Sequence, residues 1–277
     1  MFQEPLATLS ELSASREYNI GQVLSSLTGL SNWFASKSVL DMYAGKGSQL
    51  MCDSFWCDFY YNTVMKSSFE KRKQEKPPFL ARALGVNQLK PTIMFNDQGL
   101  LLAKAFALGL VEEGEAIGRS SLIGLREGWF YGMEQNYLTP FVLSVFAKWK
   151  NVTLSSEAFP FVVHDGYAGL LQNLTAHTEE IRSAINDACD FHLSRSKDHD
   201  DETTYEFADP VYAVYPVEIL FVLRVRKILG LSNPAVDHPL MNTPIAQLPD
   251  GDGSLSPSLK PIFENMKQVL RINDHMN

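Results

Sequence analysis

The segment YPVEILFVLRVRKILG, residues 215–230, decides the fold class because it carries the start, the body and the stop of one helix. Pro216 suits the first turn, where its missing N–H leaves no bond unmade, and Glu218 adds the negative charge that a helix N-terminus favours. Basic residues lie near the other end, where they suit the helix dipole, and Gly230 is a typical stop. The segment therefore predicts a strongly apolar helix.

Similar signals recur along the rest of the chain. A helical pattern over residues 20–73 is broken by the glycines of AGKGS, residues 44–48, and is stopped by the prolines of KPPF, residues 76–79. An alanine- and leucine-rich helix should follow residue 99. Three further helices are expected, over residues 139–150, 167–193 and 261–272.

Glycines punctuate the segment after that alanine-rich helix. Gly114, Gly118, Gly124 and Gly128 recur within one helical pattern. Glycine weakens an isolated helix, but its lack of a side chain permits close helix–helix approach. We therefore expect these positions to lie where helices meet.

The sequence pattern also argues against a β-sheet protein. No alternating run is long enough for a sheet, and FPFVV, residues 159–163, is the only plausible short strand. The sequence therefore predicts an all-α fold, a multi-helix bundle. No repeat or low-complexity linker divides it, so one large domain is expected over residues 1–277, with a loop-rich segment over 233–261. A subdivision near 76–98 would separate an N-terminal helical hairpin from the main helical bundle.

Composition and charge restrict the class of partner. Hydrophobic residues make up 45% of the 277 residues and charged residues 20%, so the chain can bury a sizeable core. The formal net charge of −8 argues against nucleic acid and against an anionic membrane as partners, because both favour basic surfaces. This charge is compatible with a basic protein partner.

Cysteine use and the first residues indicate the compartment. Three cysteines give no disulfide framework and favour a reducing environment. The first residues show neither the basic part nor the long apolar part of a secretory signal, and Arg224 and Arg226 interrupt the longest apolar run. We therefore expect a cytoplasmic protein with no membrane span.

Three patterns that resemble ligand sites are better explained by helix packing. AGKGS has its lysine before the second glycine and a helical pattern in front, unlike a phosphate-binding loop, so a helix–helix turn is expected. Cys52 and Cys57 have no second pair and the wrong spacing for zinc. His177 and Glu180 reverse the Glu-x-x-His order of di-iron bundles, and only one such pair occurs. No metal or cofactor is therefore expected.

The main enzymatic alternative is a helical HD-type phosphohydrolase, which depends on metal. Its site combines a distant histidine, an adjacent His-Asp pair and a later aspartate. Here His164 or His177 would be the first ligand, His199 and Asp200 the pair, and Asp237 the last. The pair lies among polar residues with no apolar neighbour to bury it, and no motif of a nucleophilic enzyme is present. No catalytic residue is therefore assigned.

The stretch KDHDDETTYEFAD, residues 197–209, gathers six carboxylates around one histidine just before the apolar helix. A charge run of this kind is usually a solvated loop. Its functional interpretation is an exposed acidic lip that meets a basic partner. The predicted contact residues are its first five carboxylates: Asp198, Asp200, Asp201, Glu202 and Glu206.

The C-terminal third also resembles a known family. Residues 179–230 comprise a helix ending in DFHLSRS, an acidic loop, and a proline-started apolar helix that ends in Gly-Leu. This order is similar to the C-terminal portion of all-helical immunity proteins from bacterial polymorphic-toxin, contact-dependent and type VI secretion systems. The residues that carry the resemblance are Tyr215, Pro216, Glu218, Leu220, Arg224, Gly230 and Leu231.

The resemblance implies a cytoplasmic protein without catalytic activity that binds and neutralises a cognate toxin in bacterial competition. Many toxins that attack nucleic acid are basic, so an acidic inhibitor gains steered association with them. A helical scaffolding protein with some other partner is the remaining alternative.

Overall fold

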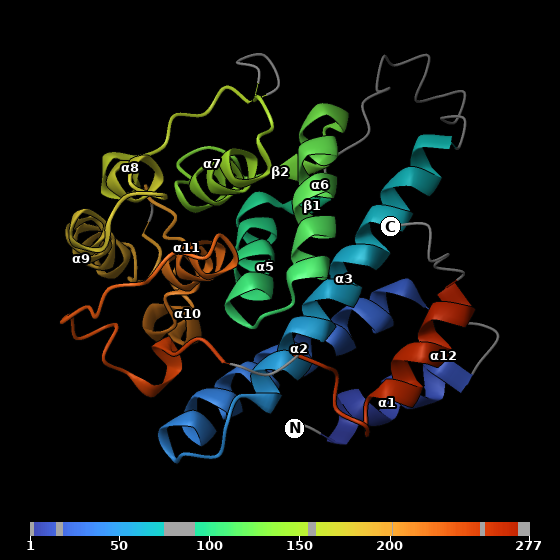
Figure 1. Cartoon of the computed structure of the whole chain (residues 1–277). Helices are drawn as coiled ribbons and strands as arrows, with labels where there is room; N and C mark the ends of the chain where they lie inside the picture. Colours follow the sequence, from blue (N-terminus) through green and yellow to red (C-terminus); the bar gives the residue numbers. More distant parts are fainter. Residues whose placement is uncertain are drawn as a thin grey trace.

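The chain folds almost entirely into helix (Figure 1). The computed structural model describes residues 3–14, 19–74, 92–154, 159–200, 202–249 and 253–270, and about 66% of these residues are helical, which confirms the all-α multi-helix bundle. None of the helices in these ranges is long and apolar enough to cross a membrane. The helices are α1 (Gln3–Ala14), α2 (Ile20–Tyr43), α3 (Gln49–Gln74), α5 (Phe95–Ala107), α6 (Val111–Glu127), α7 (Leu138–Lys150), α8 (Asp165–Gln172), α9 (Thr178–Ser194), α10 (Pro210–Val214), α11 (Val217–Ile228) and α12 (Lys260–Leu270), with one 3-10 turn at Pro244–Ala246.

Extended structure occurs at a place that the sequence did not indicate. The strands β1 (Ile93–Met94) and β2 (Phe130–Tyr131) form a short parallel pair. Along the chain, β1 directly precedes α5 and β2 follows α6. The expected strand over 159–163 is wrong, because that segment is irregular in the structure. Its aromatic rings pack without a partner strand: Phe161 stacks on Phe95 with centroids 5.2 Å apart. Phe159, Phe161 and Val163 pack against the core, whereas Val162 is exposed.

The helix expected over residues 167–193 is in fact two helices, α8 and α9, which pack against each other. The apolar residues expected on one face of a single helix are buried, but they are divided between the two helices and face each other across the pair. The break is stabilised by cations from other helices, which bind the carbonyl groups released there. Lys148 donates to the carbonyl of Leu171 at 2.7 Å, and Arg226 donates to that of Leu174 at 2.7 Å.

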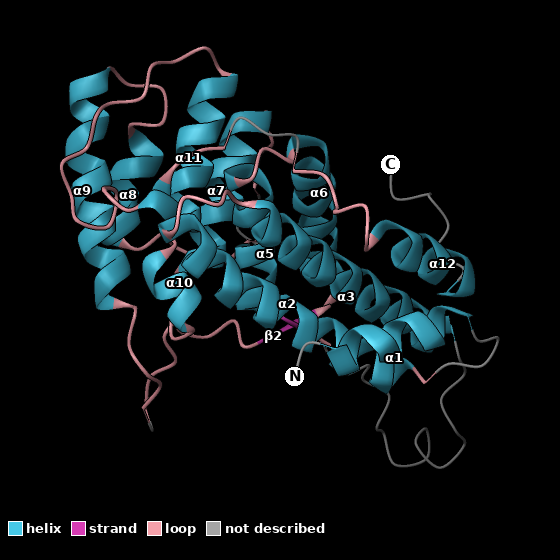
Figure 2. Cartoon of the chain, turned by 90° about the horizontal axis from the view of Figure 1, so that it is seen from below, coloured by secondary structure: helices cyan, strands magenta, loops and turns pink. Residues whose placement is uncertain are grey.

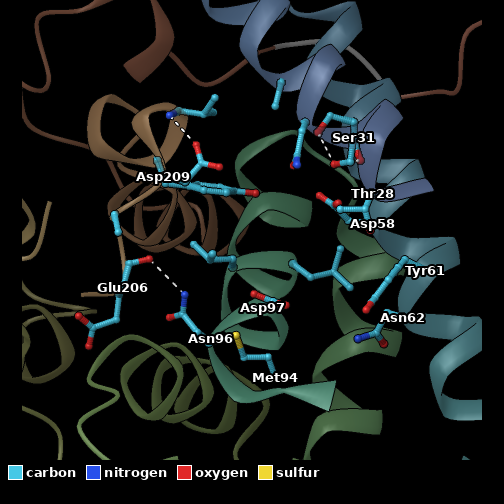
Figure 3. Close-up of a pocket in the computed structure, with 18 of the residues that line it drawn as sticks. Thr28, Ser31, Asp58, Tyr61, Asn62, Met94, Asn96, Asp97, Glu206 and Asp209 are labelled. Atoms are coloured by element: carbon cyan, nitrogen blue, oxygen red, sulfur yellow. Dashed lines mark hydrogen bonds between the residues drawn. The ribbon is translucent and has the colours of Figure 1, made fainter. Parts of the chain in front are cut away.

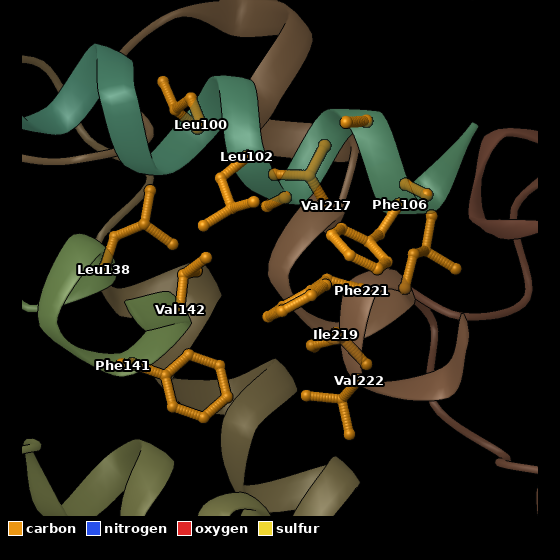
Figure 4. Close-up of a cluster of buried hydrophobic side chains, with 14 of the residues drawn as sticks. Leu100, Leu102, Phe106, Leu138, Phe141, Val142, Val217, Ile219, Phe221 and Val222 are labelled. Atoms are coloured by element: carbon orange, nitrogen blue, oxygen red, sulfur yellow. The ribbon is translucent and has the colours of Figure 1, made fainter. Parts of the chain in front are cut away.

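The helix that decided the fold class is confirmed and lies at the centre of the core. Every residue of α11 up to Arg226 is buried, and Gly230 stops the helix with a φ of +73°. Figure 4 shows α11 meeting α5 and α7 through Phe221, Phe106 and Val142. The Phe106 and Phe221 rings lie 4.8 Å apart at their centroids. Layers of apolar side chains from α5, α7 and α11 thus form the main core.

The predicted close helix–helix approach is confirmed at Gly114 and Gly118, which meet α5 and α7, whereas Gly124 is covered by Trp129 just after α6. A Cβ at Gly114 would lie 2.4 Å from the Phe106 ring, one at Gly118 2.5 Å from the Phe146 ring, and one at Gly124 2.6 Å from the Trp129 ring. Gly128 has a different role, because it ends α6 with a φ of +72°. The glycine-rich face of α6 is therefore where large aromatic rings reach the helix backbone.

A smaller second cluster joins the two ends of the chain. Helices α2 and α3 form an antiparallel hairpin whose turn is AGKGS, as expected, and α1 and α12 cover one side of it (Figure 2). Tyr60 of α3 stacks on Phe263 of α12 with centroids 4.4 Å apart. The segment before α12 is tied down as well, because Trp56 Nε1 donates to the carbonyl of Gly253 at 3.1 Å and Ser256 N donates to Asp53 Oδ1 at 2.9 Å.

One cation of α3 is buried without an ion pair in the described ranges. Lys66 is 6% exposed, its Nζ donates to Ser120 Oγ at 2.7 Å, and it lies 5.7 Å from the centroid of the Trp129 ring. Burial lowers the pKa of Lys66 from 10.5 to about 7. Because burial disfavours the charged amine, this side chain costs the folded state free energy.

Replacing Lys66 with methionine should therefore stabilise the protein. Between about pH 7 and pH 10.5 the unfolded state binds more protons than the folded state, so wild-type stability rises with pH; below pH 7 both states are protonated and the cost is fully present. Lys66→Met should raise the free energy of unfolding at pH 7 by about 3 to 4 kcal/mol. The gain should shrink as the pH approaches 10.

Urea denaturation of both proteins at several pH values measures this difference. Lys71→Met, at an exposed position of the same helix, is the matched control and should change stability by less than about 0.5 kcal/mol. A gain for Lys66→Met that is the same at every pH would contradict the assignment.

Candidate functional site

A cavity of about 350 Å³ opens where the α2–α3 hairpin meets the start of α5 (Figure 3). The segment over residues 204–212 closes its other side, and β1 and β2 lie at one end. Three aspartates from separate elements line it: Asp58 of α3, Asp97 of α5 and Asp209, which precedes α10. The cavity therefore collects negative charge from parts of the chain that are far apart in sequence.

Asp58 is neutralised by a cation inside the protein. Lys104 of α5 is fully buried, and its Nζ donates to Asp58 Oδ2 at 2.9 Å and to Ser54 Oγ at 2.7 Å. The same ammonium group lies 5.8 Å from the centroid of the Tyr212 ring. Behind Asp58, outside the lining of the cavity, an ammonium group thus lies between a carboxylate, a hydroxyl group and an aromatic face.

Asp97 lies lower in the cavity and has no such partner. Its carboxylate is open to the cavity and forms no hydrogen bond or ion pair with the described residues. Desolvation by the surrounding protein atoms raises the pKa of Asp97 from 3.8 to about 6, and the negative charge of Asp58 adds to this effect. Asp97 is therefore a carboxylate that would gain from a neighbouring positive charge.

A buried relay of amides orients Asn62 beside Asp97. Ser121 Oγ donates to the carbonyl of Ile117 at 2.7 Å, so it must accept the hydrogen from Gln98 Nε2, which is also 2.7 Å away. Gln98 Oε1 then accepts from Asn62 Nδ2 at 2.7 Å. Because each link has one direction, the Asn62 amide cannot be reversed. Its Oδ1 is left as an acceptor, on a side chain that is 6% exposed and lines the cavity.

A second cavity, of about 290 Å³, adjoins the first and shares Met94, Asn96, Thr204 and Glu206 with it. Exposed Glu134 and Glu202 line its outer part. The two cavities together are called the acidic groove below, and the groove runs from Asp58 to these glutamates. No lysine or arginine lines either cavity within the described part of the chain.

The predicted acidic lip forms part of this groove, but only some of its carboxylates are exposed. Asp198, Asp200 and Glu202 are exposed, and Asp201 lies outside the described residues. The expectation that Glu206 is exposed is wrong, since it is 5% exposed.

Glu206 is buried because it holds the loop to the body of the protein. Arg195 Nε donates to Glu206 Oε2 at 2.6 Å, and the backbone N–H of Tyr137 donates to Oε1 at 2.7 Å. Its own carbonyl accepts from Asn96 Nδ2 at 3.1 Å. Glu206 therefore positions the groove wall instead of offering a free charge.

The loop is also more ordered than a solvated charge run. Asp200 Oδ1 accepts from the backbone N–H groups of Glu202 at 3.0 Å and Thr203 at 2.6 Å, and these bonds lower the pKa of Asp200. His199 Nδ1 accepts from the backbone N–H of Tyr205 at 3.1 Å. The two members of the His-Asp pair thus organise their own loop.

Two of the other residues of the phosphohydrolase alternative, His164 and Asp237, are also engaged elsewhere. His164 caps α8 through Gly166 N at 3.1 Å, and its ring stacks on Phe191. His177 precedes the first turn of α9, and Asp237 accepts from Asn242 Nδ2 at 3.2 Å. Among the residues that the structure describes, no three His, Cys, Asp or Glu side chains group as a metal site would require.

The polar residues of α3 that line the groove were not predicted from the sequence, although their spacing indicates that they share one helix face. Ser54, Asp58 and Asn62 follow each other at four-residue intervals within the aromatic run of α3, so they share one helix face. Lys104 is a single charge inside an apolar helix. A polar stripe in one buried helix and a lone cation in another indicate that the two meet.

Removing the charge of Glu206 should loosen the groove wall. Glu206→Gln keeps the shape but leaves the Arg195 guanidinium, whose side chain is 12% exposed, without its counter-ion. We expect a loss of about 2 to 3 kcal/mol in the free energy of unfolding and faster hydrogen exchange over residues 197–209. Glu202→Gln, in the same loop but exposed, is the control and should change neither quantity measurably. Equal behaviour of the two variants in urea denaturation and hydrogen exchange would contradict this role.

Comparison of the chain with protein-family models, with curated proteins and with solved structures gave no match in any of the three. The resemblance of the C-terminal third to helical immunity proteins therefore stays a prediction.

Proposed function

We propose that the protein is a cytoplasmic immunity protein without catalytic activity, which neutralises a cognate secreted bacterial toxin by binding a basic segment of it in the acidic groove. The observation that carries this proposal is the excess of unpaired carboxylates over cations in a groove made of two adjoining cavities. The C-terminal resemblance and the net charge of −8 support it.

The charges of the groove do not balance. Asp58 is paired with Lys104, and Glu206 is paired with Arg195. Four further carboxylates line the groove without an ion pair in the described ranges: Asp97, Glu134, Glu202 and Asp209. A partner must therefore bring positive charge if it is to fill the groove favourably.

The position of these charges suits binding of a protein segment. Glu134 and Glu202 are exposed at the outer part, where they attract a partner at long range, and Asp97, which is exposed too, lines the first cavity, where a bound segment would desolvate it. Exposed charges chiefly raise the association rate, whereas desolvated contacts chiefly slow dissociation. The phosphohydrolase alternative lacks a comparable arrangement, because four of its five candidate ligands are committed to other contacts.

Co-expression tests the proposal. The product of the reading frame adjacent to the gene should arrest growth of a host cell, and this chain should restore growth and co-purify with that product. A reading frame whose product is harmless, or whose toxicity this chain does not relieve, would contradict the proposal.

Charge reversal locates the contact surface. The groove variant carries Glu134→Lys, Asp198→Lys and Glu202→Lys, and it spares buried Glu206 so that the fold is preserved. A control variant makes the same change in net charge at three exposed positions outside the groove: Glu11→Lys, Asp187→Lys and Glu264→Lys.

The groove variant should associate with the purified toxin at least about 10-fold more slowly at low salt and lose most of the salt dependence of the association rate. The control variant should retain most of both. Equal effects of the two variants, measured by stopped-flow or surface plasmon resonance, would place the contact surface elsewhere.

A further inference from the structure

The lower end of the first cavity, around Asp97, offers hydrogen-bond acceptors and aromatic faces. No lysine or arginine of the described residues lines it. Asp97 contributes a carboxylate without a partner, and the amide relay leaves Asn62 Oδ1 as an oriented acceptor on a side chain that is more than nine-tenths buried. Lys104, the buried cation of the same helix as Asp97, is already bound by Asp58 and Ser54. A ligand for this place must therefore donate hydrogen bonds.

Two tyrosines complete the surroundings of Asp97. Tyr61 of α3 and Tyr131 of β2 line the same end of the cavity, and Figure 3 shows Tyr61, Asn62 and Asp97 around one space. Burial raises the pKa of Tyr61, and the charges of Asp97 and Tyr131 add to this effect, which indicates that the three groups are neighbours. Tyrosine rings attract cations through their faces.

We propose that this end of the cavity is a binding site for one guanidinium group, which donates to the Asp97 carboxylate and to Asn62 Oδ1 and lies against the tyrosine rings. The inference deepens the proposed function and rests on it for the source of the cation, an arginine side chain of the toxin. A guanidinium group suits the site better than an ammonium group for three reasons. It is planar, it donates in a fixed fork to a carboxylate, and it is weakly hydrated and stacks on aromatic rings.

The protein itself shows that a cation is accommodated in this type of surroundings. Lys104 lies behind Asp58, which lines the same cavity, and is held between a carboxylate, a hydroxyl group and the face of Tyr212. Arg195 provides a second example at the groove wall, where its guanidinium carbon lies 4.7 Å from the centroid of the Tyr205 ring while it binds Glu206. The lower end repeats these features but has no cation of its own.

The experiment is an NMR titration of the ¹⁵N-labelled full chain with three capped amino acids. N-acetyl-arginine amide carries the guanidinium group, N-acetyl-lysine amide carries an ammonium group, and N-acetyl-citrulline amide has the shape of arginine without its charge. The side-chain amide signal of Asn62 reports occupancy. Asp97→Asn is the test variant, and Asp187→Asn, at an exposed position outside the groove, is the control.

The arginine probe should shift the Asn62 signal saturably, with the lysine probe several-fold weaker and the citrulline probe without effect. Asp97→Asn should weaken binding of the arginine probe by about 10-fold or more, because a charge-assisted hydrogen bond is lost, whereas Asp187→Asn should weaken it about 2-fold at most. Asp97→Asn should fold normally, since it removes an unfavourable charge. Equal binding of arginine and citrulline probes, tighter binding of the lysine probe, or no saturable shift would each overturn the guanidinium site.

The toxin serves as the second arm and separates the two sources of the cation. If Asp97→Asn weakens the purified toxin by about 10-fold as well, the cation is an arginine of the toxin. If only the arginine probe is weakened, the site exists but takes a free small guanidinium compound, and the assignment to the toxin is overturned. Growth rescue without any binding of the arginine probe would overturn the site and leave the proposed function standing.

Discussion

The ion pair between buried Lys104 and half-buried Asp58 is the interaction on which the groove depends. An ammonium group in the middle of an apolar helix is costly unless a carboxylate and other polar groups compensate it. Asp58 and Ser54 of α3 provide that compensation at 2.9 Å and 2.7 Å. Helix α3 must therefore meet α5 at this point, and the same contact turns the polar face of α3 toward the cavity. The pair thus joins the hairpin to the main core and builds the floor of the groove.

Most of the fold follows from local signals, and the exceptions have physical causes. The start and stop of α11 could be predicted because Pro216 and Gly230 act through the backbone of their own segment. The division of residues 167–193 into α8 and α9 could not, because the apolar stripe has the same spacing on one helix as on two facing ones. What distinguishes the two cases is the capping of the broken turn by Lys148 and Arg226, which lie far away in sequence.

The candidate site could be predicted only in part, for the same reason. The acidic loop was found because its charges are consecutive, whereas Asp97 and Asn62 come from separate helices and meet only in the folded chain. Sequence also could not show that Glu206 is buried, because its partner Arg195 lies across the loop and Tyr137 comes from a different part of the chain. The loop is therefore a fitted wall of the groove, and its order depends on two long-range contacts.

The central claim is that the Asp97 carboxylate binds a cation supplied by a ligand. The titration of Asp97 tests this claim most directly. The carboxyl carbon of Asp97 can be followed by NMR with pH in the full chain, alone and with saturating N-acetyl-arginine amide. The titratable groups that act on it or lie beside it are Asp58, Tyr61, Tyr131 and Tyr212. The account predicts a midpoint near pH 6 for the free protein and a clearly lower one with the probe, because a bound guanidinium favours the ionised carboxylate. A midpoint near the ordinary value of 3.8 that does not move with the probe would contradict it.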